Sequence, residues 1–301
     1  VRAVVTVRGL KARVLCNTSV RNVSFEPKKV KVITLDVTGT LLLHKTDVVE
    51  SYVECLKWSH IHLHNSTDEL RKPFKEAYKA ALNKYPCFGF AARMSGSDWW
   101  RLMLEDFLHR AKIKTTPHQF ERFFRRIYQH YGSMKGYESL PDAVELLNWI
   151  ATVNNTPGMR SYSTGVISNT PTRTVDTVLP LLDLHNHFDW FLCCREIGVE
   201  KPNVGIYEEA HRRAEHYVPG LLREEMLHIG DNFTTDFCGA RAAGMQALYL
   251  DRSANERIGT YQEWLKAPDY EGKSEADIKA HTITSLRTVK EHLIAANNCK
   301  E

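Results

Sequence analysis

The chain has 301 residues, which is enough for one large α/β domain or for a core domain that carries an insert, but too few for two large independent domains. Its 43% hydrophobic and 25% charged residues are typical of a globular protein and exclude collagen-like, disordered and disulfide-scaffold classes. No apolar run approaches the roughly 18 to 20 residues of a membrane span, and none near the start resembles a signal peptide. We therefore expect a protein that is neither secreted nor membrane-spanning.

Positive charge is concentrated at the start of the chain. The formal net charge is +4, but the first 35 residues hold eight Lys or Arg against Glu26 alone, so they carry +7 and the rest of the chain carries −3. Three interpretations of this basic arm (residues 1–31) are open: a solvated tail, a contact for RNA or another polyanion in a ribonucleoprotein, and the remnant of an organelle-targeting sequence. The chain begins at Val1 rather than at Met, which fits a removed leader. Localisation is expected to be intracellular, and mitochondrial is favoured over cytoplasmic.

Cysteine usage also favours a reducing compartment. The seven cysteines are odd in number and scattered, and they lack the CxxC spacing that is typical of zinc or redox sites. The adjacent pair Cys193 and Cys194 is expected to pack in the core of a strand.

The hydrophobic pattern divides the chain into an arm, a core and an insert. Apolar and polar residues alternate over residues 1–16, which predicts a hairpin within an N-terminal arm of residues 1–29. From about 46 to 135 the pattern is helical, with a capping box at Ser66 and Glu69 and a helix start at Thr116 and Pro117. The predicted domains are therefore an α/β core of residues 30–45 and 136–301, and a helical cap of residues 46–135.

Short apolar runs that alternate with helical stretches predict the core. These runs cover residues 30–35, 165–167, 188–192, 226–229 and 247–250. This alternation is typical of a parallel sheet with crossover helices, so the expected fold is a doubly wound, Rossmann-like α/β core.

Polar residues follow four segments of this predicted sheet. The first strand ends in Asp36-Val37-Thr38-Gly39-Thr40, the second in Ser168-Asn169, and a later one in Gly230-Asp231-Asn232, with Asp236 one helical turn beyond; Lys201-Pro202 lies between them. Ligands of open α/β sheets bind beyond the carboxyl ends of the strands, so these side chains are expected to converge. Any one of them alone would be explained as a turn former. All four in this order favour a site.

This ordered set resembles the haloacid dehalogenase superfamily of hydrolases over roughly residues 30–296, and the insert resembles its helical cap. The resemblance implies that Asp36 is the nucleophile and that Ser168 binds the transferred group. It implies that Lys201 neutralises the negative charge shared between Asp36 and that group. It also implies Mg²⁺, held by Asp36, the backbone carbonyl of Thr38 and Asp231, with Asp236 in support. Two carboxylates with substrate and water oxygens suit the octahedral coordination of Mg²⁺.

Four further residues are candidates for binding substrate: Thr40, Asn169, Trp99 and Trp100. Consecutive residues cannot face the same side of a helix, so one of Trp99 and Trp100 is expected in the core of the cap and the other on its substrate pocket. His60, His62 and His64 are expected to form an exposed polar loop rather than a metal site.

The chain departs from the family's phosphatases at Thr38. Those enzymes place a second Asp there, which protonates the leaving group and activates water, and general acid–base catalysis contributes about 10² to 10⁴ in rate. The local motif is similar to that of P-type ATPases, whose aspartyl phosphate persists without this Asp, and the family's dehalogenases lack it too. His44 is a candidate replacement acid.

Two functions are therefore open from the sequence. The first is a Mg²⁺-dependent hydrolase with an aspartyl intermediate, acting on a small phosphorylated substrate, or secondarily on a haloacid, and weakened by Thr38. The second is a catalytically decayed member of the superfamily that serves as a structural or assembly component of a large ribonucleoprotein, for example a mitochondrial one such as a mitoribosome.

Overall fold

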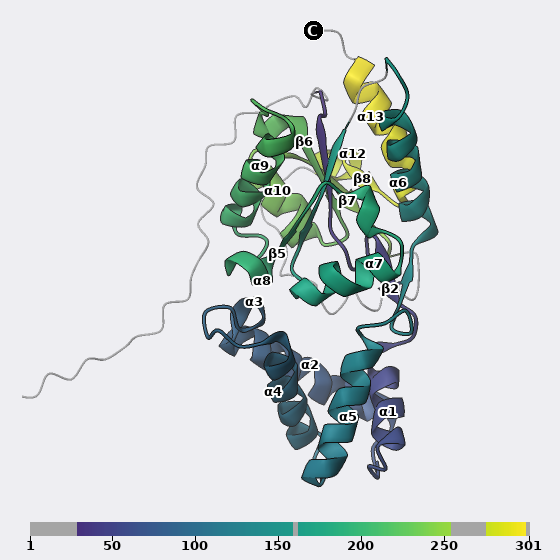
Figure 1. Cartoon of the computed structure of the whole chain (residues 1–301), viewed down its shortest axis with the longest axis vertical. Helices are drawn as coiled ribbons and strands as arrows, with labels where there is room; N and C mark the ends of the chain where they lie inside the picture. The colour runs from purple at the N-terminus through teal and green to yellow at the C-terminus, as the bar shows by residue number, and fades with distance from the viewer. Residues whose placement is uncertain (1–28, 159–161, 254–274, 299–301) are drawn as a thin grey trace, which may run out of the picture.

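The structure is a computed structural model that describes residues 29–158, 162–253 and 275–298 (Figure 1). The predicted hairpin within residues 1–16 and the basic arm up to residue 28 lie outside the described residues. The contact of this arm with RNA or a ribonucleoprotein therefore stays a prediction. Among the described residues, no helix is both long enough and apolar enough to cross a membrane.

Six parallel strands form the central sheet in the order β5-β4-β1-β6-β7-β8. The strands are β1 (Val32–Leu35), β4 (Ser163–Ser168), β5 (Trp190–Cys193), β6 (Met226–Gly230), β7 (Gln246–Leu250) and β8 (Thr282–Ile283). The central strand β1 pairs with β4 on one side and with β6 on the other, so Leu35 lies opposite both Val166 and Ile229. The chain winds outward to β5, then returns past β1 and winds outward again to β8. This confirms the predicted doubly wound fold.

One predicted strand begins later than expected. The apolar run at 188–192 suggested a start at position 188, but β5 begins at Trp190. The preceding Asp189 is joined to β4 in two ways: its amide donates to the Thr164 carbonyl at 2.9 Å, and its carboxylate accepts from the Ser163 hydroxyl at 2.8 Å and the Thr164 amide at 2.9 Å.

Alternate residues of each strand enter two separate hydrophobic cores. On β1, Val32 packs into one core and Ile33 into the other. Helix α9 (Val204–Tyr217) covers one face, while α6 (Pro141–Asn154) and α13 (Val289–Asn298) cover the other (Figure 1). The remaining core helices are short: α7 (Leu179–Leu181), α8 (Cys194–Ile197), α10 (Gly239–Ala242) and α12 (Glu275–Ala280). A strand buried on both faces explains why the sequence shows continuous apolar runs rather than alternation.

The insert is a group of helices below the core in Figure 1. It comprises α1 (Val48–Trp58), α2 (Thr67–Lys84), α3 (Pro86–Gly89), α4 (Gly96–Arg110) and α5 (Pro117–His130). Two capping boxes begin helices as predicted, Ser66 with Glu69 for α2 and Thr116 with Gln119 for α5. Inside, Tyr52, Phe74 and Phe107 meet edge to face, with ring centroids 4.7 to 6.2 Å apart. These rings belong to the same hydrophobic cluster as Val32 and α9, so the cap core is continuous with one face of the sheet.

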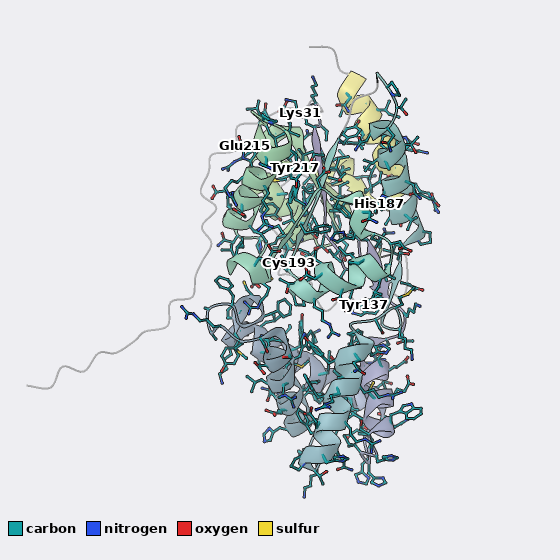
Figure 2. The ribbon with its side chains drawn as sticks, viewed as in Figure 1. Lys31, Tyr137, His187, Cys193, Glu215 and Tyr217 are labelled. Atoms are coloured by element: carbon teal, nitrogen blue, oxygen red, sulfur yellow. The ribbon has the colours of Figure 1, made fainter. Side chains whose placement is uncertain are left out.

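Two chain crossings connect the cap to the core. They pair as the antiparallel strands β2 (Leu42–His44) and β3 (Tyr137–Ser139), which the sequence analysis did not predict. Tyr137 lies where the cap meets the core (Figure 2). Three-residue strands are too short to give a periodic signal, so the pairing becomes visible only once the two crossings are side by side.

Candidate active site

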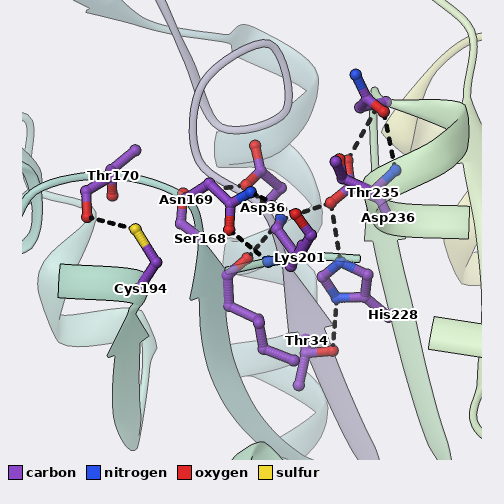
Figure 3. A network of polar contacts seen from close by, with 12 residues as sticks. Thr34, Asp36, Ser168, Asn169, Thr170, Cys194, Lys201, His228, Thr235 and Asp236 are labelled. Carbon is purple, nitrogen blue, oxygen red and sulfur yellow. Dashed lines mark hydrogen bonds and ion pairs between the residues drawn. The ribbon is translucent and has the colours of Figure 1, made fainter. Parts of the chain in front are cut away.

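Side chains from the ends of three neighbouring strands converge at one edge of the sheet (Figure 3). Asp36 follows β1, Ser168 ends β4, and Asp231 follows β6; all three are buried. The Ser168 hydroxyl donates to Asp36 Oδ1 at 3.0 Å, and Lys201 Nζ donates to the same oxygen at 2.7 Å. The structure thus brings together the residues expected to act as nucleophile, group binder and charge neutraliser.

Lys201 is the centre of this network. Its buried ammonium group also donates to Asp236 Oδ1 at 2.5 Å and to the backbone carbonyl of Ile167 at 2.8 Å. All three donors of the ammonium group therefore have acceptors, which a buried cation requires. The lysine comes from the loop after α8 and not from a strand end.

Asn169 has a positioning role that differs from the expected one. We expected it to bind substrate, but its amide Nδ2 donates to the Lys201 carbonyl at 2.9 Å, and its Oδ1 accepts from the Lys201 amide at 2.8 Å. An amide side chain that pairs with both backbone groups of one residue fixes that residue's position. Asn169 still borders the cavity described below, but its main contacts are with Lys201.

The charges in the network are strongly coupled. Burial raises the pKa of the Asp36 carboxyl to about 6, while the Lys201 ammonium opposes this shift. For Asp236, burial alone would raise the pKa, but Lys201 and His228 outweigh it and hold the pKa well below its usual range. For Lys201, burial would lower the pKa, but Asp236 and Asp36 outweigh it and raise the pKa. The lysine is therefore charged and opposite an ionised Asp236.

His228 extends the network beneath the site and was missed by sequence analysis. Its Nε2 lies 3.2 Å from Asp236 Oδ1, and its Nδ1 lies 2.9 Å from the Thr34 hydroxyl (Figure 3). Burial lowers its pKa, so the ring is neutral. The signal was present in the sequence, since a histidine that interrupts the apolar run of β6 must find polar partners inside the sheet.

Three carboxylates are placed to hold a cation. Oxygens of Asp36, Asp231 and Asp236 all lie within 4.8 Å of one another, and the residues are buried. Hard oxygen donors in this number suit Mg²⁺, so the residues present fit the ion that the fold family implies. Asp236 already receives Lys201, His228 and the Asn232 amide, which favours Asp36 and Asp231 as the direct ligands.

A second cluster joins the cap to the core. Cys87 of α3, Cys194 of α8 and Glu200 have ligand atoms within 4.8 Å of one another. Both thiols act as hydrogen-bond donors, Cys87 to Glu200 at 3.9 Å and Cys194 to the Thr170 carbonyl at 3.8 Å. Sequence analysis missed this cluster because the two cysteines are more than a hundred positions apart. Cys194 begins a helix, whereas we expected both Cys193 and Cys194 within a strand.

The loop after Asp36 is held in place by Arg252, on the side away from the cavity. Its guanidinium donates to the Gly39 carbonyl at 2.9 Å and to the Thr40 carbonyl at 3.3 Å, and it forms a buried ion pair with Asp142 at 3.0 Å. Thr40, expected to bind substrate, is fully buried in this loop and does not line the cavity. Arg252 was missed, although it follows the apolar run of β7 as the other site residues follow theirs.

A cavity of about 270 Å³ opens between the cap and the core beside these residues. Thr38 and Asn169 border it on the core side, and Trp100 borders it on the cap side. Trp99 is only 1% exposed and donates its indole N–H to the Tyr85 carbonyl at 3.0 Å, so our expectation that it binds substrate was wrong. The two tryptophans divide as helix geometry requires.

The histidines singled out in the sequence lie apart from the reacting groups. His44 borders the cavity among Tyr131 and Tyr137, and burial lowers its pKa to about 4. A ring that is neutral at pH 7 is a poor proton donor, which argues against His44 as the replacement acid. His60, His62 and His64 are exposed at and after the end of α1, as expected of a polar loop.

Comparison with known proteins places the chain in a family. A family model described as haloacid dehalogenase-like hydrolase matches residues 30–244, and the chain belongs to this family. The haloacid dehalogenase-like hydrolase domain-containing protein 3 of Xenopus laevis is 27% identical over 220 residues, which are 73% of this chain and 84% of the relative. The glyceraldehyde 3-phosphate phosphatase of Methanothermobacter thermautotrophicus is 37% identical over 97 residues, 32% of this chain and 41% of that protein.

Solved structures confirm the fold. An L-2-haloacid dehalogenase superposes with a TM-score of 0.61 and 14% identity, over 89% of this chain and all of that one. A hydrolase of the same superfamily from Bacillus subtilis, solved bound to magnesium, superposes with a TM-score of 0.56 and 16% identity, over 88% of this chain and 99% of that one. At these identities the likeness concerns the fold alone.

Proposed function

We propose that the chain is a Mg²⁺-dependent hydrolase that forms a covalent intermediate on Asp36 with a small phosphorylated substrate. The observation that carries this proposal is the meeting of Asp36, Ser168, Lys201 and Asp231 at the carboxyl edge of β4, β1 and β6. The phosphatase of Methanothermobacter thermautotrophicus and the magnesium-bound hydrolase of Bacillus subtilis agree with the substrate class and the ion.

The first step is displacement at phosphorus. A carboxylate oxygen of Asp36 attacks, the bond from phosphorus to the leaving oxygen breaks, and that oxygen departs with the electron pair. Ser168 donates a hydrogen bond to the transferring group, and the Lys201 ammonium stabilises its equatorial oxygens. Bound Mg²⁺, held by Asp36, Asp231 and the Thr38 carbonyl, would neutralise charge on the phosphoryl oxygens. Water then attacks phosphorus, the bond to Asp36 breaks and inorganic phosphate is released.

Thr38 leaves both steps without a titrating group at that position. Its hydroxyl neither protonates the leaving oxygen nor deprotonates the attacking water near neutral pH. Turnover is therefore slow with leaving groups that need a proton. The same feature supports a haloacid as the second candidate substrate, because a halide leaves carbon without a proton when Asp36 attacks.

The test is covalent modification of the full chain. Incubation with Mg²⁺ and acetyl phosphate should add one phosphoryl group, seen by intact-mass spectrometry, and beryllium fluoride should block the addition. Asp36→Asn should abolish the adduct. The matched control is Asp251→Asn, since Asp251 also follows a strand of the sheet, β7, but lies outside the carboxylate cluster.

Mg²⁺ binding gives an independent readout. Mg²⁺ should raise the melting temperature of the wild type and of Asp251→Asn, and raise that of Asp36→Asn much less. The absence of both the adduct and a Mg²⁺ effect would contradict the hydrolase proposal and favour a protein without catalysis.

A further inference from the structure

The cavity beside Asp36 limits what the leaving group of a substrate can be. The core side of the cavity includes Thr38, two positions after Asp36, and Asn169, directly after Ser168. A phosphoryl group at Asp36 therefore has its leaving oxygen and the attached group directed toward the cavity. This inference rests on the proposed function, because it concerns the substrate of that same site.

Aromatic side chains are the largest apolar group in the walls of the cavity. Eight of the lining residues are Phe, Tyr or Trp, contributed by the cap helices and the crossings beside them; five others are Val, Leu, Ile or Pro, and eight are polar or charged. Most of the exposed surface of the lining is apolar, so it gains more from burying an apolar group than from a polyhydroxylated one, which would give up its hydrogen bonds to water. The lining therefore favours a substrate whose leaving group is flat and apolar.

The charges on the same walls are all positive. Arg173, Lys75 and Lys79 line the cavity, and no Asp or Glu does. Arg173 is half-buried, with its guanidinium carbon 3.8 Å from the centre of the Tyr128 ring, and it forms no ion pair or hydrogen bond with another described residue. A partly desolvated guanidinium without a carboxylate favours an anionic group on the ligand.

The chemistry of Thr38 also favours an aromatic leaving group. Without a general acid, the leaving oxygen must depart as an anion. A phenol has a pKa near 10, as the tyrosine side chain does, whereas an alkyl alcohol resembles water at about 15.7. An aryl leaving group therefore tolerates the loss of the proton donor far better than an alkyl one.

We propose that the substrate is an aryl phosphate whose ring occupies the aromatic cavity and carries a second anionic group that pairs with Arg173. The ring then lies against Trp100 and its neighbours, and the phosphoryl group lies at Asp36. Arg173 is a specificity residue in this arrangement, because it contacts the far end of the leaving group and not the reacting atoms.

Binding of four stable phosphonates to the full chain with Mg²⁺ tests this, measured by calorimetry. The set crosses two properties: ethylphosphonate and 3-phosphonopropionate are aliphatic, phenylphosphonate and 4-phosphonobenzoate are aromatic, and the second of each pair carries a carboxylate. The expected order places 4-phosphonobenzoate first, about tenfold or more tighter than phenylphosphonate, since a charge-assisted pair is worth about that much. Phenylphosphonate should in turn bind more tightly than ethylphosphonate.

Substitutions at two residues, Arg173 and Trp100, separate the contribution of the carboxylate from that of the ring. Arg173→Gln should remove most of the carboxylate increment, while Arg173→Lys should keep part of it. Trp100→Leu should reduce the preference for the ring. Arg122→Gln is the matched control, because Arg122 is an exposed arginine of α5 that does not line the cavity. Circular dichroism and melting temperature establish that each variant is folded.

Equal binding of phenylphosphonate and 4-phosphonobenzoate to the wild type would overturn the proposal. The proposal would also be overturned if Arg173→Gln and Arg122→Gln lost the same amount of affinity for 4-phosphonobenzoate. The phosphoryl adduct on Asp36 is a separate readout. An adduct without selective binding leaves the hydrolase proposal standing and ends this one. Selective binding with neither an adduct nor a Mg²⁺ effect on the melting temperature ends the hydrolase proposal.

Discussion

Gly39 and Asp231 approach so closely that a Cβ atom at position 39 would lie 2.2 Å from Asp231 Oδ2. Gly39 also has a φ of +87°, in the left-handed region that L side chains rarely adopt. The turn after Asp36 therefore requires glycine for two separate reasons: the left-handed backbone conformation at position 39, and the space that Asp231, a candidate metal ligand, occupies.

Gly39→Ala should lower stability and Mg²⁺ affinity together. Gly220→Ala is the control, since Gly220 has a φ of +72° but a Cβ atom there would meet nothing within 4 Å. Backbone strain of about 1–3 kcal/mol applies to both variants, so the difference between them reports the contact with Asp231. Thermal melts with and without Mg²⁺ measure it. Equal Mg²⁺ stabilisation in the two variants would mean that Asp231 does not hold the ion.

Thr38→Asp should raise phosphatase activity. An aspartate there restores a proton donor, which contributes about 10² to 10⁴ when well placed. We expect at least a tenfold increase with ethyl phosphate and a smaller one with phenyl phosphate, because phenolate leaves more easily without protonation. Steady-state phosphate release checks this. An unchanged rate with both substrates would mean that proton transfer is not what limits the wild type.

The buried pair of Arg252 and Asp142 should matter more for stability than a similar pair at the surface. Arg252→Met leaves Asp142 without its cation in the interior, which costs about 3 to 5 kcal/mol. Arg287→Met breaks an exposed pair with Glu145, with an N–O distance of 2.6 Å, and should lower the free energy of unfolding far less, because water and salt screen exposed charges. Urea unfolding compares them. Similar losses in both variants would show that the loop after Asp36 does not depend on Arg252.

His44 should make stability depend on pH. Burial lowers its folded-state pKa to about 4, with Asp47 opposing and His130 assisting the shift, while the unfolded ring titrates near 6.5. The unfolded state therefore binds a proton first, so stability is present above about pH 6.5 and is lost as the pH falls toward 4.

At pH 5 this loss is on the order of 1–2 kcal/mol relative to pH 7. His44→Phe, which can keep the ring contacts with Tyr131 and Tyr137, should remove that part of the pH dependence. His62→Phe, at an exposed position, should not. Urea unfolding at pH 5 and pH 7 gives the comparison, and parallel profiles for wild type and His44→Phe would contradict the assignment.

The strand ends could be predicted from sequence because parallel strands bring their carboxyl ends to one edge, whatever the details of packing. Asp36, Ser168 and Asp231 were found in this way. Arg252 follows a predicted strand too, and the same rule applied there would have found it. The helical cap followed from periodicity and from the caps at Ser66 and Thr116.

Contacts between distant segments could not be predicted in the same way. Which of Trp99 and Trp100 faces the cavity depends on the rotation of α4 against α2, which periodicity alone does not fix. Asn169 was expected to bind substrate because it follows Ser168 at a strand end. It borders the cavity, but its amide also pairs with a backbone more than thirty positions away. Cys87 and Cys194 become neighbours only after the cap folds onto the core.

The hydrogen-bonded register of β4, β1 and β6 sets the spacing of Ser168, Asp36 and Asp231. The aromatic rings and cations that would select a leaving group stand mostly on helices reached through the two short strands β2 and β3. The carboxylate cluster therefore stands on the sheet edge, and most of the aromatic lining of the cavity stands on the cap, while Arg173 enters the cavity from the core side. Under the proposed function, exchange of cap side chains would change which leaving group fits while Ser168, Asp36 and Asp231 keep the spacing that the sheet register sets.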